Sequence, residues 1–146
     1  MKEERNETII EFDSEPFNFE KAGFASTEIK KHLKSLKIDS SIIRRIGIAS
    51  YELEINQVIH SLGGKMIYHI DDEKVIIEAV DIGPGIPDIQ KAGTEGFSTA
   101  SEKVRSMGFG AGMGIPNTKR VSDEFTLESS TTGTRAVATI YFNGEK

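Results

Sequence analysis

The sequence predicts an α+β fold, in which a largely antiparallel β-sheet packs against helices as a two-layer sandwich. Apolar residues recur with the 3.6-residue period of a helix across residues 25–58, and β-rich runs joined by short turns make up most of the other patterned segments. The chain has 146 residues, of which 37% are hydrophobic and 28% charged, which is typical of one globular domain with its own core. We therefore expect residues 1–146 to form a single domain.

The first predicted elements are a short strand and a helix. Thr8–Asp13 (TIIEFD) is rich in β-branched residues and predicts a strand. Pro16 interrupts this run, and from about Phe19 the pattern becomes helical. Four apolar residues at helical spacing predict the face of this helix that packs on the sheet: Ala25, Ile29, Leu33 and Leu36.

A second, longer helix is predicted to follow. Asp39, Ser40 and Ser41 are candidate N-cap residues, since their side chains can accept the first free backbone N–H groups. Apolar residues then recur as far as Val58, and the pair Gly63-Gly64 predicts the C-terminal end of the helix.

Two hairpins complete the predicted sheet. Met66–Ile70 and Lys74–Ile82 are predicted strands, with an acidic turn at residues 71–73 between them. Glu124–Ser129 and Thr134–Phe142 predict the second hairpin. Hairpin partners run antiparallel, which is why the sheet is expected to be largely antiparallel.

A glycine-rich region separates the two hairpins. Eight of the fourteen glycines fall between Gly83 and Gly114, and residues 83–112 show no clear periodicity. A loop of this length inside a compact domain is usually functional or mobile. A third helix is predicted from about Gly114 to Asp123, with Pro116 tolerated in its first turn.

Composition excludes several classes of protein. Cysteine is absent, which excludes disulfide scaffolds, thiolate metal sites and cysteine nucleophiles. No run approaches the roughly 18 apolar residues of a membrane span, and the acidic first residues do not resemble a signal peptide. We therefore expect a cytoplasmic protein without membrane attachment. The net charge of −5 also argues against nucleic acid as the main partner.

Charge is unevenly distributed along the chain. Residues 1–20 carry a net −5, residues 21–50 a net +5 and residues 51–146 a net −5. The basic segment is either a partner surface or an ordinary solvated helix face.

The second predicted helix carries a polar stripe. Glu52, Asn56 and His60 are spaced i, i+4, i+8 and therefore lie on one side of the helix. The carboxamide of Asn56 can offer an oxygen to Mg²⁺, and the carboxylate of Glu52 can accept a proton from a nucleophile. The alternative is the polar face of an amphipathic helix, with Glu54 as an equally exposed neighbour.

A second motif follows the strand Lys74–Ile82. Asp81 closes an apolar run, where a buried carboxylate needs a hydrogen-bond donor such as the exocyclic amine of a purine. Gly83 and Gly85 permit close approaches that a side chain would forbid. A simple D-x-G-P-G turn is the alternative interpretation.

A third motif is the run G-F-G-A-G-M-G at residues 108–114. Alternating glycines let backbone N–H groups converge on an anion, and the helix that follows adds the positive end of its dipole. Lys119 and Arg120 lie one to two turns further on, within reach of a phosphate. The run is neither a Walker A loop nor a dinucleotide fingerprint, and a flexible linker is the alternative.

The order of these motifs resembles the Bergerat-fold (GHKL, histidine-kinase-like) ATPases, the family of gyrase B and the histidine kinases. Glu52 and Asn56 match the N box, Asp81–Gly85 the first glycine box, Gly108–Gly114 the second, and Gly133-Thr134 the final Gly-Thr motif. The short length, with F-S-T at 97–99 and K-R-V-S-D-E-F at 119–125, most resembles RsbT-type switch kinases and then RsbW-type anti-sigma factors of bacterial partner switching. The resemblance implies a mixed, mainly antiparallel sheet packed on three helices.

The resemblance also implies site roles. Glu52 would be the general base, Asn56 would coordinate the Mg²⁺ that bridges the ATP phosphates, and Asp81 would accept a hydrogen bond from the adenine amino group with support from Thr134. A lid at about residues 86–107 would close over the nucleotide. Further ATP contacts would come from the two glycine boxes and the third helix: Gly83, Gly85, Ile86, Gly108, Phe109, Gly110, Ala111, Gly112, Met113, Gly114 and Lys119.

The implied function is that of an ATP-dependent serine/threonine kinase that phosphorylates a small anti-anti-sigma-like protein. A sigma factor or a phosphatase would be a further partner, and a homodimer is a further expectation. Two alternatives stay open: an ATP-dependent conformational switch without phosphotransfer, and a stand-alone ATPase.

Overall fold

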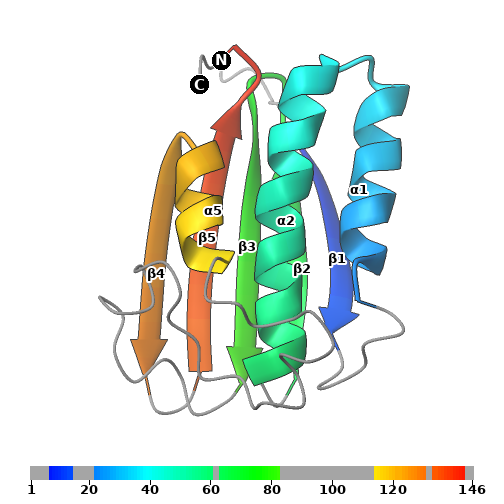
Figure 1. Ribbon diagram of the computed structural model, residues 1–146. Helices are drawn as coiled ribbons and strands as arrows, with labels where there is room; N and C mark the ends of the chain where they lie inside the picture. Colours follow the sequence, from blue (N-terminus) through cyan, green and yellow to red (C-terminus); the bar gives the residue numbers. More distant parts are fainter. Residues whose placement is uncertain (1–6, 15–21, 61–62, 83–113, 131–132, 144–146) are drawn as a thin grey trace, which may run out of the picture.

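The computed structural model describes residues 7–14, 22–60, 63–82, 114–130 and 133–143, and these form a sheet covered on one face by helices (Figure 1). The five described strands lie in the order β1-β2-β3-β5-β4, and all four neighbouring pairs are antiparallel. The predicted α+β two-layer sandwich is therefore confirmed, and the described strands form a more uniform sheet than the mixed one expected.

Each predicted strand is present, and its ends agree with the prediction to within two residues. Side chains alternate between the two faces of the sheet, so every second residue is buried against the helices from Met66 to Ile70 of β2 and from Val75 to Ala79 of β3. The strands are β1 (Thr8–Ser14), β2 (Gly64–Ile70), β3 (Lys74–Ile82), β4 (Glu124–Ser130) and β5 (Gly133–Tyr141).

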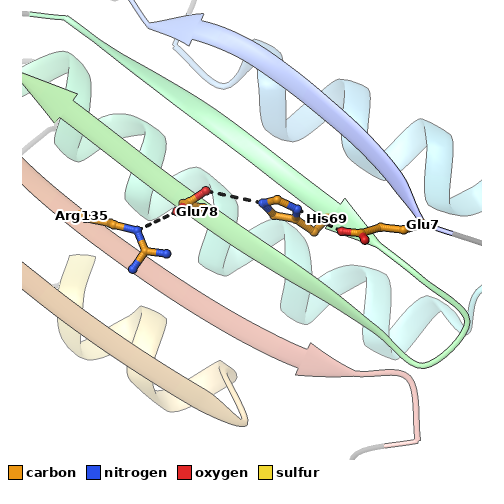
Figure 2. A network of polar contacts seen from close by, with 4 residues as sticks. All are labelled: Glu7, His69, Glu78 and Arg135. Carbon is orange, nitrogen blue, oxygen red and sulfur yellow. Dashed lines mark hydrogen bonds and ion pairs between the residues drawn. The ribbon is translucent and has the colours of Figure 1, made fainter. Parts of the chain in front are cut away.

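The other face of the sheet carries a row of polar contacts across the strands (Figure 2). His69 on β2 lies between two carboxylates, with Nδ1 3.2 Å from Glu7 Oε1 and Nε2 3.5 Å from Glu78 Oε1. Arg135 on β5 donates through Nε to Glu78 Oε2 at 2.7 Å. These contacts link neighbouring strands through side chains, in addition to the backbone hydrogen bonds of the sheet.

Among the described residues, three helices form the second layer, and the apolar face of each packs on the sheet or on its neighbour. The buried core joins both layers and includes Ile29, Leu33, Ile46, Tyr68 and Ile77. The helices are α1 (Phe24–Ser35), α2 (Ser40–His60) and α5 (Gly114–Val121).

The first helix is shorter than predicted. It begins at Phe24 rather than at about Phe19, which lies outside the described residues. Gly23 precedes it with φ +91°, a left-handed conformation that glycine adopts without strain. At the other end Leu36 follows the helix and is 49% exposed, so the prediction that Leu36 belongs to the apolar face is wrong.

The predicted ends of the second helix are confirmed. Asp39 caps it, because Asp39 Oδ1 accepts the backbone N–H of Ser41 at 3.0 Å. The helix extends to His60, Gly63 has φ +135°, and Gly64 already belongs to β2.

The last helix ends at Val121 rather than Asp123. Asp123 precedes β4 and hydrogen-bonds to β5, where its Oδ2 accepts the backbone N–H of Tyr141 at 2.8 Å. The glycine-rich residues 83–113 lie outside the described part of the chain, so the long loop and the lid at 86–107 stay predictions. Among the described helices, none is both long and apolar enough to cross a membrane.

Candidate functional site

The elements that carry the predicted site residues meet at one end of the sheet. Figure 1 shows the C-terminal ends of α2 and β3 and the first residues of β5 at this end. Helix α5 packs on α2 over the same face of the sheet. The ends of α2 and β3 and the start of β5 therefore lie in the same region of the molecule.

Asp81 is a half-buried carboxylate in this region. It lies on β3 between Gly64 of β2 and Thr134 of β5, on the side of the sheet that faces the helices. Its Oδ1 accepts the backbone N–H of Thr134 at 3.1 Å. Burial raises the pKa of Asp81, and the hydrogen bond from Thr134 opposes this effect. The contact joins two residues of the predicted site, and the support that Thr134 would give to adenine binding by Asp81 stays a prediction.

Two glycines allow the neighbouring strands to approach Asp81 closely. A Cβ atom at position 133 would clash with the backbone oxygen of Asp81. A Cβ atom at position 64 would lie 2.7 Å from the oxygen of Val80 and 2.9 Å from Cβ of Asp81. Gly64 was predicted only to mark the end of a helix, and in the structure it also allows β2 to lie close to Asp81.

Gln57 connects α2 to the strand that carries Asp81. Its side chain is buried, and Nε2 donates to the backbone oxygens of Lys65 at 3.0 Å and Val80 at 3.2 Å. Because Gln57 is next to Asn56 in the sequence, this contact fixes the position of the Asn56 turn of α2 relative to the end of β3. The sequence analysis did not identify Gln57.

Glu52 and Asn56 are half-buried on the same stripe of α2, as predicted from their spacing. Glu52 Oε1 accepts a hydrogen bond from Nδ2 of Asn117 at 3.3 Å, and Asn117 lies in the first turn of α5. Asn117 Oδ1 in turn accepts a hydrogen bond from Arg120 at 3.1 Å. Three side chains thus form a polar chain from α5 to the carboxylate on α2.

Glu54 corrects one expectation of the sequence analysis. It is 5% exposed, not an exposed neighbour of Glu52. Its carboxylate accepts the backbone N–H groups of Gly23, Ala25 and Ser26 at 3.0–3.2 Å and the Ser26 hydroxyl at 2.8 Å. Residues two apart on a helix point in different directions, so Glu54 caps α1 while Glu52 faces α5.

Comparison with known proteins gives similarity along much of the chain, although no family model matches it. The chain is 40% identical over 91 residues to the serine/threonine-protein kinase RsbT of Bacillus subtilis (strain 168), which covers 58% of this chain and 61% of RsbT. It is 32% identical over 129 residues to the anti-sigma F factor of Thermoanaerobacter sp. (strain X514), which covers 84% of this chain and 87% of that protein. The chain belongs to the family of RsbT and the anti-sigma F factors.

A second anti-sigma F factor supports membership of this family. The protein of Caldanaerobacter subterraneus subsp. tengcongensis is 32% identical over 112 residues, which covers 73% of this chain and 75% of that protein. The match to RsbT spans about three fifths of that kinase, whereas the anti-sigma F matches span three quarters or more of their proteins. The resemblance inferred from the motifs is thus confirmed at the level of the family.

In this member of the RsbT and anti-sigma F family, the structure places only part of the predicted site. Asp81 contacts Thr134, Glu52 and Asn56 share a stripe, Gly114 begins α5, and Lys119 is exposed. Within the described residues, no cluster of three or more His, Asp or Glu side chains could hold a metal ion. The other predicted contacts lie outside the described residues: Gly83, Gly85, Ile86, Gly108, Phe109, Gly110, Ala111, Gly112 and Met113.

Sequence reasoning missed Asn117, Gln57 and the role of Gly64. The only local signal for Asn117 is its place in the first turn after the glycine run, where a polar side chain borders the predicted phosphate site. The contacts of Gln57 and Gly64 depend on the strand register, which no local pattern gives.

Proposed function

We propose that this chain is an ATP-dependent serine/threonine kinase of bacterial partner switching. It would transfer the γ-phosphate of ATP to a serine or threonine of a small anti-anti-sigma-like protein. The observation that carries the proposal is the Asp81 carboxylate, held by Thr134 at 3.1 Å between two glycines beside the helix that bears Glu52 and Asn56. Membership of the family of RsbT and the anti-sigma F factors supports it.

Asp81 is proposed to recognise adenine. One carboxylate oxygen accepts the backbone N–H of Thr134, which leaves the other oxygen to accept a hydrogen bond from the adenine amino group. Guanine carries a carbonyl oxygen at the equivalent position, and this oxygen would face the carboxylate without a donor. The site should therefore select ATP over GTP. Gly83, Gly85 and Ile86 are proposed to complete the adenine pocket.

The phosphates are proposed to lie over the start of α5. Backbone N–H groups of residues 108–114 and the Lys119 ammonium would bind them. The half-buried carboxamide of Asn56 fits a Mg²⁺ ligand, since Mg²⁺ in nucleotide sites is usually held by one or two side-chain oxygens, phosphates and waters. When bound, Mg²⁺ would neutralise negative charge on the phosphate oxygens.

Glu52 is proposed to act as the general base. The serine oxygen of the partner forms a bond to the γ-phosphorus, the bond from that phosphorus to the β–γ bridging oxygen breaks, and ADP leaves. The proton of the serine hydroxyl passes to the Glu52 carboxylate. Positioning and charge neutralisation supply most of the rate in such transfers, and the base adds about 10²- to 10⁴-fold.

Phosphotransfer from γ-labelled ATP to purified anti-anti-sigma-like proteins tests the proposal. We expect Glu52→Gln to lower the transfer rate by about 10²- to 10⁴-fold without weakening ATP binding. Asp81→Ala should weaken ATP binding by about 10- to 100-fold, because a hydrogen bond to a charged group is lost. Glu73→Gln and Asp72→Ala, in the exposed turn at the opposite end of the sheet, are the matched controls.

Two results would contradict these assignments. A phosphotransfer rate in Glu52→Gln equal to that of the unaltered chain would show that the general base is another group. ATP binding that survives both Asp81→Ala and Asn56→Ala would place the nucleotide elsewhere.

A second candidate function is an ATP-dependent binding switch that holds a sigma factor without phosphotransfer. The observation that favours it is the longer match to the anti-sigma F factors, which covers 84% of this chain compared with 58% for RsbT. It predicts nucleotide-dependent capture of a sigma factor, with no label transferred to any partner. The same labelled-ATP assay therefore separates the two functions.

A further inference from the structure

We propose that Asn117 is a positioning residue that holds the Glu52 carboxylate in the orientation needed for proton transfer. The inference rests on the proposed kinase function, because it assigns a task to the neighbour of the proposed base. Asn117 Nδ2 lies 3.3 Å from Glu52 Oε1, and the contact is partly buried between α2 and α5.

The chemistry of the two partners fixes the orientation of the Asn117 amide. An ionised carboxylate only accepts hydrogen bonds, and a guanidinium only donates them. Asn117 lies between Glu52 and Arg120, so its NH₂ group must face Glu52 and its oxygen must face Arg120. The structure has this orientation: Nδ2 lies 3.3 Å from Glu52 Oε1, and Oδ1 lies 3.1 Å from Nη1 of Arg120. Exchanging the two ends of the amide would place donor against donor and acceptor against acceptor.

Helix α5 is held firmly enough to present Asn117 in a defined place. At its C-terminal end, Arg45 of α2 donates through Nε to the backbone oxygen of Val121 at 3.0 Å. Thr118 and Ser122 are buried, and the Ser122 hydroxyl donates to the backbone oxygen of Thr118 at 2.6 Å. The amide of Asn117 therefore reaches Glu52 from an element already attached to the same helix.

A fixed amide matters because the end of a glutamate side chain turns easily. The last torsion of Glu has a broad, roughly two-fold energy profile, so an unrestrained carboxylate adopts many orientations. A hydrogen bond to Oε1 reduces this freedom and leaves Oε2 to receive the proton. Misplacement of a reacting group by about 1 Å can cost about 100-fold in rate. At 3.3 Å the bond is longer than average, and we expect its loss to cost about tenfold.

Four purified variants test this role: Asn117→Ala, Asn117→Asp, Glu52→Gln and the double variant Asn117→Ala/Glu52→Gln. The readouts are kcat for phosphotransfer, ATP affinity and Tm. Asn117→Ala should lower kcat about tenfold and leave ATP affinity within about twofold of the unaltered chain. Asn117→Asp has nearly the same shape but replaces the donor with a negative charge, so it should lower kcat further.

The double variant separates positioning from a purely structural role. If Asn117 acts through Glu52, its removal has no further effect once the carboxylate is gone, and kcat of the double variant equals that of Glu52→Gln. Asn143→Ala, an exposed asparagine at the opposite end of the sheet, is the matched control and should change none of the readouts.

Each outcome decides the inference. If Asn117→Ala lowers kcat by the same factor in the unaltered chain and in Glu52→Gln, the positioning role is overturned. Unchanged kcat in both Asn117→Ala and Asn117→Asp would also overturn it. Absence of any phosphotransfer by the unaltered chain would instead overturn the proposed function, and the positioning role with it. The side-chain amide signal of Asn117 in NMR spectra checks the contact separately, and it should shift in Glu52→Gln but not in Glu73→Gln.

Discussion

At the scale of single residues, the Asp81 carboxylate is placed where its charge costs stability. Burial raises the pKa of Asp81, so the ionised form is less favourable in the folded chain than in the unfolded chain. The contribution of this group to stability is therefore full below the pKa of an unfolded Asp, about 3.9, and is lost as the pH rises through the raised folded value. A charge kept at such a cost is typical of a site selected for binding.

Asp81→Asn should accordingly stabilise the fold near neutral pH. Asparagine keeps an oxygen that can accept the N–H of Thr134 but carries no charge. We expect Tm to rise by about 1–3 °C at pH 7 and the gain to disappear below about pH 4. Thermal melts of both chains between about pH 3 and pH 8 measure the effect, with Asp72→Asn in the exposed turn as the control. A lower Tm for Asp81→Asn at pH 7 would contradict this account.

At the scale of elements, Glu54 determines where α1 begins. Glu54→Ala would leave the N–H groups of Gly23, Ala25 and Ser26 without their carboxylate acceptor in a buried position. We expect the free energy of unfolding to fall by about 3 kcal/mol, from the loss of a helix cap and of hydrogen bonds to a charged group. Urea unfolding measures the loss.

The matched control for this variant is Glu28→Ala. Glu28 lies on α1, the helix that Glu54 caps, and its ion pair with Lys31 is exposed, with 3.5 Å between the charged atoms. Such pairs contribute about 0–1 kcal/mol, so this control should change little. Equal losses in the two variants would mean that Glu54 does not cap α1.

The sequence predicts elements well where their signals are local. Strand ends follow from alternation and turn residues, and the start of α2 follows from Asp39, two residues before its partner Ser41. The predicted start of α1 was wrong because the residue that caps this helix, Glu54, lies about 30 residues further along the chain. The stripe of Glu52 and Asn56 was predictable from helical spacing. The contact between Glu52 and Asn117 was not, because it joins residues 65 positions apart.

At the scale of the whole molecule, the basic segment 21–50 proves to have two parts. Arg45 is buried and pairs with Asp123, so it belongs to neither of the two predicted alternatives for this segment, a partner surface or a solvated face. The remaining described cations of the segment are exposed and keep both alternatives open: Lys30, Lys31, Lys34, Lys37 and Arg44.

The pair of Arg45 and Asp123 joins three parts of the fold. Arg45 of α2 lies 3.1 Å from Asp123 Oδ1 and also donates to the end of α5, while Asp123 Oδ2 accepts the N–H of Tyr141 at the end of β5. Their side chains are 10% and 16% exposed, so removing one partner leaves a nearly buried charge. Asp123→Ala should therefore lower the free energy of unfolding by about 3–5 kcal/mol.

A double-mutant cycle with Arg45→Met tests whether the pair acts as a unit. We expect a coupling energy of about 1–3 kcal/mol that changes little between low and high salt, because a buried pair is poorly screened. The exposed pair of Lys65 and Glu11, at 3.8 Å with side chains 56% and 52% exposed, is the control and should give less than about 1 kcal/mol. Coupling no larger than that of the control would mean that Arg45 and Asp123 do not stabilise the fold as a pair.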